Sequence, residues 1–152
     1  METKFNFKSQ ICTDRNQSER LLALGLKKET ADMCYKVTTH DFKGNEINEI
    51  DRHYTLCCWY DESSLVCGLE RKETIPAWSL HRLIEMMPPD RKYEWLTISK
   101  NDVFYRCIHF GEEDFIGPNY CGDNLYDSFV IMYEWLIKEG YFNKEYLDNG
   151  ND

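Results

Sequence analysis

The chain has 152 residues, of which 42% are hydrophobic and 14% aromatic, and its 27 Asp and Glu against 18 Lys and Arg give a formal net charge of −9. This length fits a single domain, residues 1–152, and the aromatic content is too high for a disordered chain. The acidic balance excludes a broad basic surface for nucleic acid, because such binding depends on Lys and Arg that neutralise phosphates.

The amino-terminal residues and the cysteines indicate the compartment. METKFNFK contains no apolar stretch long enough for a signal peptide. Nowhere does the chain hold the run of about 18 apolar residues that a membrane helix needs, so we expect a cytoplasmic protein that does not enter the membrane. Seven cysteines, an odd number at irregular spacing, indicate mostly buried thiols rather than a disulfide framework.

The first predicted helix is defined by residues at both of its ends. Asp14, followed three residues later by Gln17, resembles a capping box. Apolar residues at 21, 22 and 24 form one helical face. Gly25 stands where a left-handed residue ends a helix, and Leu26 can reach back to Leu21 as in a Schellman motif.

Two further helices and a terminal turn follow from apolar spacing. The second helix is predicted after Pro76 and ends at Pro88, with apolar residues at i, i+3, i+4 and i+7, namely Leu80, Leu83, Ile84 and Met87. The third, about residues 124–139, is apolar over most of its circumference, so it must be covered on several sides, by the domain itself or by a partner. Gly140 ends it, and Asn143 is expected to cap a short terminal helix.

Between the helices lie strand patterns. Residues 33–38 form one candidate strand, residues 53–60 and 65–69 a first hairpin, and residues 95–99 and 103–110 a second. The sequence therefore predicts an α+β fold: an antiparallel sheet built from hairpins and covered by three to four helices in one compact domain. We expect a polar loop or mobile insertion near residues 38–51 and a mobile tail at residues 148–152.

Three blocks of the chain carry a resemblance to known proteins. They are residues 17–33 (QSERLLALGLKKETADM), 76–87 (PAWSLHRLIEMM) and 134–147 (EWLIKEGYFNKEYL). Together they resemble a group of small uncharacterised proteins that recur in Bacteroides-type gut bacteria, often in prophage or mobile-element surroundings. The resemblance implies a bacterial cytosolic protein, accessory to a mobile element. It transfers no activity, cofactor or site residue, because none is established for that group.

Metal binding is the first chemistry to weigh. His53, Cys57, Cys58 and Cys67 cluster in the sequence, and a structural zinc site needs four converging ligands of these types. In a strand, however, Cys57 and Cys58 point to opposite faces, and His53 lies roughly 13 Å from Cys57 at about 3.3 Å per residue. Only a loop conformation allows these residues to share an ion, so we expect no metal and no cofactor.

Thiol chemistry is the second. Cys107 and His109, at i and i+2 of one strand, face the same way, and residues 112–114 (EED) could orient the imidazole. The alternative is an ordinary strand face that ends in a hydrogen-bonded His, with residues 112–114 as a solvated loop. Cys121, in a Gly-rich loop, is another candidate nucleophile without an evident base. The common nucleotide-binding and hydrolase motifs are absent.

A binding surface is the third possibility. Trp78 begins an amphipathic helix whose outer side carries His81, Arg82 and Glu85, and aromatic and Arg side chains are frequent at interaction hot spots. The alternative is that Trp78 fills the core between helix and sheet. The leading hypothesis is a non-enzymatic protein-interaction or regulatory module with an unknown protein partner, for which a homo-oligomer stays open. A thiol enzyme is second. An acidic mimic of nucleic acid is third, because acidic and basic residues are interspersed.

Overall fold

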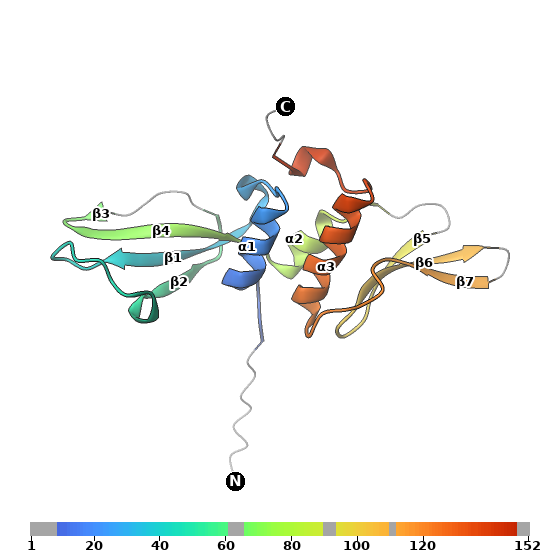
Figure 1. Ribbon diagram of the computed structural model, residues 1–152, viewed down its shortest axis with the longest axis horizontal. Helices are drawn as coiled ribbons and strands as arrows, with labels where there is room; N and C mark the ends of the chain where they lie inside the picture. Colours follow the sequence, from blue (N-terminus) through green and yellow to red (C-terminus); the bar gives the residue numbers. More distant parts are fainter. Residues whose placement is uncertain (1–8, 61–65, 90–93, 110–111, 149–152) are drawn as a thin grey trace, which may run out of the picture.

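The computed structural model describes residues 9–60, 66–89, 94–109 and 112–148 (Figure 1). Within them lie three α-helices, three short 3-10 turns and seven strands in two antiparallel sheets. In chain order the helices and strands are α1 Arg15–Ala23, β1 Met33–His40, β2 Tyr54–Cys57, β3 Val66–Cys67, β4 Glu70–Ala77, α2 Leu80–Glu85, β5 Glu94–Ile98, β6 Val103–His109, β7 Glu112–Ile116 and α3 Leu125–Lys138. The 3-10 turns are Lys28–Thr30, Glu49–Asp51 and Lys144–Tyr146.

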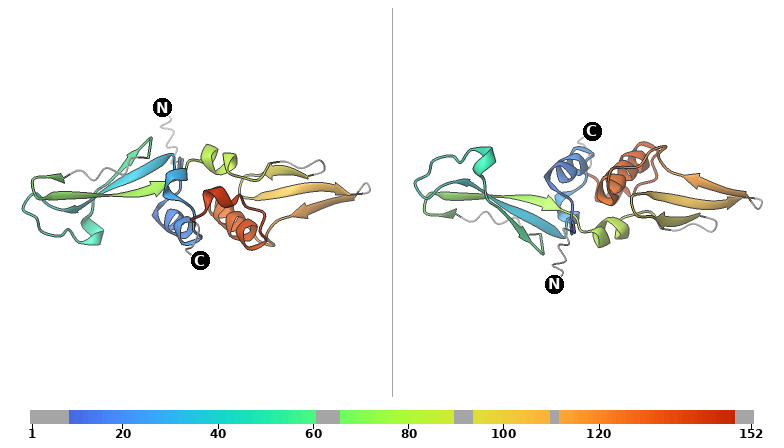
Figure 2. Two further views of the ribbon diagram at one scale, coloured as in Figure 1. Left: turned by 90° about the horizontal axis from the view of Figure 1, so that it is seen from above. Right: turned by 90° about the horizontal axis from the view of Figure 1, so that it is seen from below.

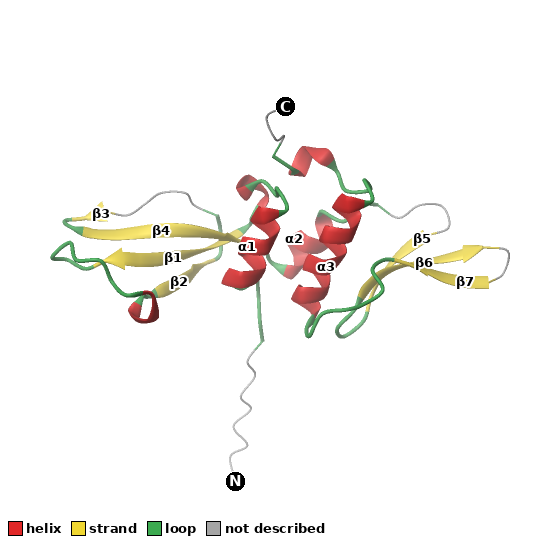
Figure 3. Ribbon diagram, viewed as in Figure 1, coloured by secondary structure: helices red, strands yellow, loops and turns green. Residues whose placement is uncertain are grey.

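The helices occupy the middle of the molecule and the two sheets project from opposite sides of them (Figures 1 and 2). The predicted α+β class is confirmed, but the prediction of one sheet covered on one face is wrong. The described strands form a four-stranded sheet in the order β2-β1-β4-β3 and a separate three-stranded sheet in the order β5-β6-β7 (Figure 3). The physical reason is that α2 and α3 lie between the sheets, so each sheet packs its own inner end against the helices.

The first predicted hairpin is also wrong in its pairing. β2 and β3 do not pair with each other: β2 pairs with β1, and β3 pairs with β4. β4 was missed because its outer half, Glu70 to Glu73, is charged and gives no apolar alternation. Its inner half is apolar, with Pro76 and Ala77 buried, and this half aligns β4 with β1. Residues 61–65, between β2 and β3, lie outside the described residues.

The second predicted hairpin is confirmed as β5 and β6, closed by a turn in which the Ser99 amide donates to the Asp102 carbonyl at 2.9 Å. A third strand, β7, then pairs with β6 through residues that we expected to form a loop. The expected strand at residues 33–38 is confirmed as β1 and continues to His40. We expected residues 148–152 to form a mobile tail. The Asp148 amide donates to the Gly25 carbonyl at 2.7 Å, and residues 149–152 lie outside the described part of the chain.

The helix ends form as their local sequences predict. The Asp14 side chain accepts from the Gln17 amide at 2.8 Å, and the Gln17 side chain accepts from the Asp14 amide at 2.9 Å, which completes the capping box of α1. Gly25 has φ 91° and the Leu26 amide donates to the Leu21 carbonyl at 3.2 Å, which is the predicted Schellman ending. Asn143 caps the terminal 3-10 turn as expected.

The second helix begins later than expected. Pro76 and Ala77 belong to β4, and α2 starts after Ser79, whose hydroxyl accepts from the Arg82 amide at 3.2 Å. Asp32 fixes this cap, because its carboxylate accepts from the Ser79 amide at 2.9 Å and from the Ser79 hydroxyl. The cap therefore joins the start of α2 to the segment that leads into β1.

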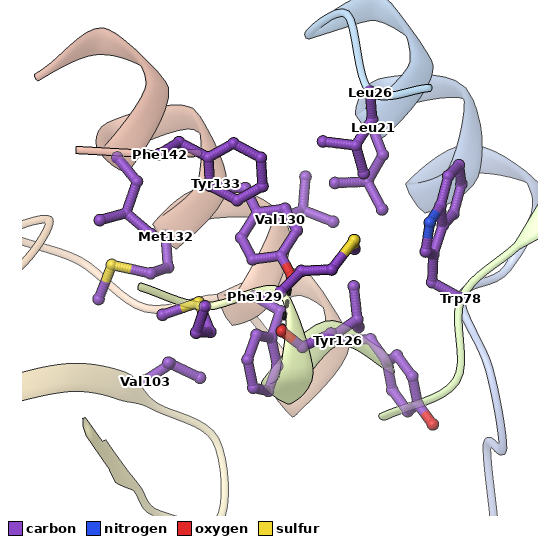
Figure 4. Close-up of a cluster of buried hydrophobic side chains, with 14 of the residues drawn as sticks. Leu21, Leu26, Trp78, Val103, Tyr126, Phe129, Val130, Met132, Tyr133 and Phe142 are labelled. Carbon is purple, nitrogen blue, oxygen red and sulfur yellow. Dashed lines mark hydrogen bonds between the residues drawn. The ribbon is translucent and has the colours of Figure 1, made fainter. Parts of the chain in front are cut away.

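The core surrounds α3. Phe129, Tyr133 and Leu136 are at most 1% exposed and pack with α1, α2 and β6 residues in one cluster, part of which Figure 4 shows. The Tyr133 hydroxyl donates to the Leu83 carbonyl of α2 at 2.6 Å, so the ring is hydrogen bonded as well as buried. Of the two alternatives for this nearly all-apolar helix, coverage within the domain is the one observed for its buried positions.

A buried polar contact joins the amino-terminal ends of α1 and α3. Gln17 is 1% exposed, and its amide group donates to the Asp127 carboxylate at 2.6 Å. Asn124, the cap of α3, also donates to Asp127, at 2.9 Å. The Gln17 side-chain oxygen accepts the hydrogen bond of the α1 capping box, and its amide group donates to Asp127 in the first turn of α3. One side chain therefore connects the amino-terminal ends of both helices.

We predict that Gln17→Ala lowers the free energy of unfolding by about 1–3 kcal/mol, because it removes one partner from buried hydrogen bonds. Gln17→Glu should cost more at neutral pH, since it places a second carboxylate beside Asp127.

Urea unfolding followed by circular dichroism measures these changes. Asn16→Ala, at an exposed position of the same helix, is the control and should stay within about 0.5 kcal/mol of wild type. A Gln17→Glu protein as stable as wild type at neutral pH would contradict the proposed contact.

Candidate functional site

The three-stranded sheet carries an exposed aromatic row on the side turned away from α3. Trp95, Arg106 and Phe115 are cross-strand partners on β5, β6 and β7. Trp95 is 42% exposed, Phe115 is 60% exposed, and Arg106 is exposed as well. The next row points the opposite way: Tyr105 is 6% exposed and Ile116 is half-buried beside it. Alternation along the strands therefore divides this sheet into a core face and an aromatic face.

Phe104 lies two residues before Arg106 on β6, so it shares the side of the sheet with Arg106, but it is half-buried and also packs against the core. Its ring meets the ring of Phe115 edge to face, with centroids 5.1 Å apart. We call the four residues Trp95, Phe104, Arg106 and Phe115 the outer face. Trp and Arg are enriched at interaction hot spots, and cross-strand neighbours lie close enough for rings and a guanidinium to act on the same bound group.

A hollow of about 330 Å³ lies beside the two phenylalanines and is completed by Asp102, Gly117, Pro118 and Asn119. Gly117 permits this arrangement, because a Cβ at this position would come within 3.1 Å of Met132 Cε in α3. The loop after β7 therefore lies close against the helix, and the hollow is a preformed feature next to exposed rings. What the outer face offers chemically is a set of apolar rings beside one guanidinium group.

Trp78 itself does not belong to the binding surface that we predicted with His81, Arg82 and Glu85. Trp78 is fully buried at the junction of β4 and α2, where its indole N–H donates to the Thr30 hydroxyl at 2.9 Å. His81 is exposed, but Arg82 pairs with Glu85 on the same helix at 3.5 Å. The alternative interpretation, in which Trp78 fills the core, is the one that the structure supports. The physical reason is that α1 packs against β4 here, a contact between distant segments that a local sequence pattern does not contain.

The residues that we weighed as metal ligands are not grouped in the described part of the chain. His53 and Cys58 are exposed, and Cys57 is half-buried on β2, in register with Cys34 of β1. The side chain of Cys67 lies outside the described residues. Among the described side chains, no three of His, Cys, Asp and Glu are grouped as metal ligands.

The predicted thiol sites stay predictions. Cys107 and His109 belong to β6. On β7 their cross-strand partners are Asp114 and Glu112, respectively. The side chains of Cys107 and His109 lie outside the described residues. Cys121 is exposed in the loop before α3. Its thiol makes no hydrogen bond within the part of the chain that the structure describes, so no base is seen beside it.

Cys12 is the described thiol with the clearest perturbation. It is 1% exposed, and its sulfur lies 3.2 Å from the Tyr35 hydroxyl. Burial raises the pKa of the Cys12 thiol, with nearby carboxylates of Asp32 and Asp14 adding to the rise. Burial likewise raises the pKa of Tyr35. Both groups are therefore protonated at neutral pH, and Cys12 behaves as a core residue.

Sequence reasoning missed the outer face because Phe115 follows three acidic residues that we expected to form a loop. The segment EEDFI has no apolar alternation that would have marked it as a strand. Recognising the third strand would have placed Phe115 beside Arg106.

Cysteine labelling should separate exposed from buried thiols. At about pH 8 iodoacetamide should modify Cys58 and Cys121 at least roughly a hundredfold faster than Cys12, because the reacting thiolate of Cys12 is both disfavoured and covered. Peptide mapping by mass spectrometry measures each site, and denaturant should remove the difference. Equal rates at Cys12 and Cys121 in the native protein would contradict the burial of Cys12.

A pair of tryptophan variants tests which indole belongs to the core. Trp78→Ala should lower the free energy of unfolding by about 3–5 kcal/mol, as expected for a fully buried ring. Trp95→Ala should change it by no more than about 0.5 kcal/mol, as expected for an exposed position. Urea titration measures both, and a strongly destabilised Trp95→Ala protein would contradict the assignment of Trp95 to an open face.

No helix among the described residues combines the length and the apolar character required to cross a membrane. Comparisons of the chain with protein-family models, with curated proteins and with solved structures found no match. The function therefore has to be inferred from the residues of the outer face and their surroundings.

Proposed function

We propose that this chain is a non-enzymatic, cytosolic protein-interaction module, accessory to a mobile element of gut bacteria, that binds a partner protein on the outer face of β5–β7. The observation that carries the proposal is the exposed row of Trp95, Arg106 and Phe115 across three paired strands. Apolar rings gathered on one open face are typical of binding surfaces rather than of an ordinary protein exterior.

The rigidity of the sheet supports this proposal. Val103 and Tyr105, on the inner side of β6, are at most 6% exposed, so the central strand is held by the core. The Tyr105 hydroxyl also donates to the Pro88 carbonyl at 2.7 Å. A face that is ordered before binding loses little conformational entropy when a partner docks on it.

Charge selects the kind of partner. Arg106 is the cation within the outer face, and the chain as a whole carries −9, so a nucleic acid would be repelled by most of the molecule. A symmetric contact between two copies of this face that places Arg106 on the two-fold axis would oppose two guanidinium groups, which is unfavourable. The partner that fits is a protein segment with a carboxylate opposite Arg106 and an apolar side chain for the hollow beside Phe104.

The other two hypotheses receive no specific support. A thiol enzyme would use Cys107 or Cys121 with His109 as the base. No described group hydrogen bonds to the Cys121 thiol, and the side chains of Cys107 and His109 lie outside the described residues. An acidic mimic needs carboxylates aligned along one face, whereas described ion pairs such as Arg20 with Glu134, at 2.8 Å, set acids against bases.

Site-specific photocrosslinking tests the proposal. Benzoylphenylalanine placed at Phe115 in host cells should give one discrete protein adduct, and Arg106→Glu should reduce it about tenfold or more by reversing the charge that pairs with the partner. The matched control is the same probe at Ile50, which is 97% exposed but lies outside the outer face, and it should not give that adduct.

Three outcomes would contradict the proposal. They are the absence of a specific adduct at Phe115, an adduct of the mass of two copies of this chain, and an adduct that persists unchanged in the Arg106→Glu protein. Circular dichroism of each variant confirms that the fold is retained.

A further inference from the structure

A second aromatic site lies on the opposite side of the same sheet, at the carboxyl-terminal end of α3. It is a small cavity of about 60 Å³ lined by three aromatic rings, two prolines and one carboxylate, namely Tyr105, Trp135, Tyr141, Pro88, Pro89 and Glu94. Glu94 and Tyr105 point to the inner side of the sheet, whereas Trp95 and Arg106 point to the outer side. The cavity is therefore separate from the outer face.

The aromatic walls are set by the way α3 ends. Gly140 has φ 77°, and the Tyr141 amide donates back to the Leu136 carbonyl at 2.9 Å. This turn brings Tyr141 against Trp135, with ring centroids 5.8 Å apart and ring planes inclined by 40°. The two rings are tilted rather than stacked, and both line the cavity.

The third aromatic ring of the cavity belongs to Tyr105, and a hydrogen bond holds it in place. Tyr105 is 6% exposed, and its hydroxyl donates to the carbonyl of Pro88, another wall of the cavity. Tyr141 is 47% exposed and forms the open side. The cavity thus has a rigid interior and an accessible entrance, and little reorganisation is needed before a small group enters it.

Three features favour a positive charge in this cavity. Aromatic faces attract cations through their quadrupole. Glu94 is the acidic residue among those that line the cavity. The last turn of α3, which supplies Trp135 and Leu136, presents the negative end of a helix dipole. A strongly hydrated metal ion would lose its water among apolar walls, whereas a methylated ammonium is only weakly hydrated.

We propose that this cavity binds a trimethylammonium group, carried either by a small molecule such as choline or by a methylated lysine side chain. The inference does not depend on the proposed function, because it uses the inner side of the sheet and a different set of residues. A protein that fails to cross-link through Phe115 can still bind the cation, and the reverse also holds.

Titration of the wild-type protein with choline decides the matter. We expect saturable shifts of the Trp135 indole N–H signal in proton–nitrogen NMR spectra. The matched probe is the uncharged isostere of choline in which carbon replaces nitrogen, and it should bind at least about tenfold more weakly, because it lacks the charge that the rings and Glu94 attract. Equal shifts with both compounds, or none with choline, would overturn the proposal.

Variants locate the site. Tyr141→Leu keeps an apolar residue after the turn but removes a ring, and Glu94→Gln keeps the size but removes the charge. Each should weaken choline binding about tenfold. Tyr120→Leu, at a tyrosine that is 64% exposed and outside the cavity, is the control and should leave the affinity unchanged. Undiminished binding in folded Tyr141→Leu and Glu94→Gln proteins would overturn the assignment.

Two peptide probes distinguish the source of the group. If the natural ligand is a modified protein, a short peptide with trimethyl-lysine should bind more tightly than choline, and the unmodified peptide should not bind in the cavity. If it is a small molecule, the modified peptide should bind no better than choline. Binding of both peptides with equal affinity would show that the cavity does not recognise methylated ammonium, and would count against the proposal.

Discussion

The apolar surface of α3 is the constraint on which the rest of the structure depends. Buried side chains occupy most of its circumference, including Phe129, Val130 and Tyr133. One side packs on α1, another on β6, and a third is joined to α2 through the Tyr133 hydroxyl. A helix of this kind is stable only when it is covered on several sides. The two sheets are consequently held apart, with the helices between them.

Polar contacts align the helices and loops around α3, because apolar burial by itself does not fix how one helix is aligned along another. Gln17 and Asp127 align the starts of α1 and α3. Near the same end of α3, the Ser128 hydroxyl donates to the Asn101 carbonyl of the β5–β6 turn and accepts from the Gly122 amide at 2.8 Å. A Cβ at Gly122 would lie 2.3 Å from that of Asp127, so this loop follows the helix closely.

The packing of the loop after β7 against α3 connects the core to both candidate sites. The loop after β7 supplies part of the hollow beside Phe104, and it is held against α3 by Ser128 and by the contact of Gly117 with Met132. The same helix ends in the turn that places Tyr141 against Trp135. One element therefore positions both candidate sites, one on each side of the three-stranded sheet. Because strands alternate, a three-stranded sheet anchored on one side can present two different chemical surfaces.

Interactions within a few residues were predictable from the sequence alone. The capping box at Asp14 and Gln17, the left-handed residues Gly25 and Gly140, and the β5–β6 hairpin each depend on hydrogen bonds between near neighbours. The period of apolar residues likewise determined that α3 had to be enclosed, though not by what.

Only the tertiary structure decided which strands pair and which aromatic rings are covered. β2 lies on the side of β1 opposite to β4. β4 pairs with β1 along its whole length, including the charged half that resembles a loop in the sequence. Three acidic residues belong to β7, the strand that carries Phe115. Trp78 is fully buried, whereas Trp95 is 42% exposed. Their difference arises from segments distant along the chain, since burial is a property of what packs over a residue and not of the residue itself.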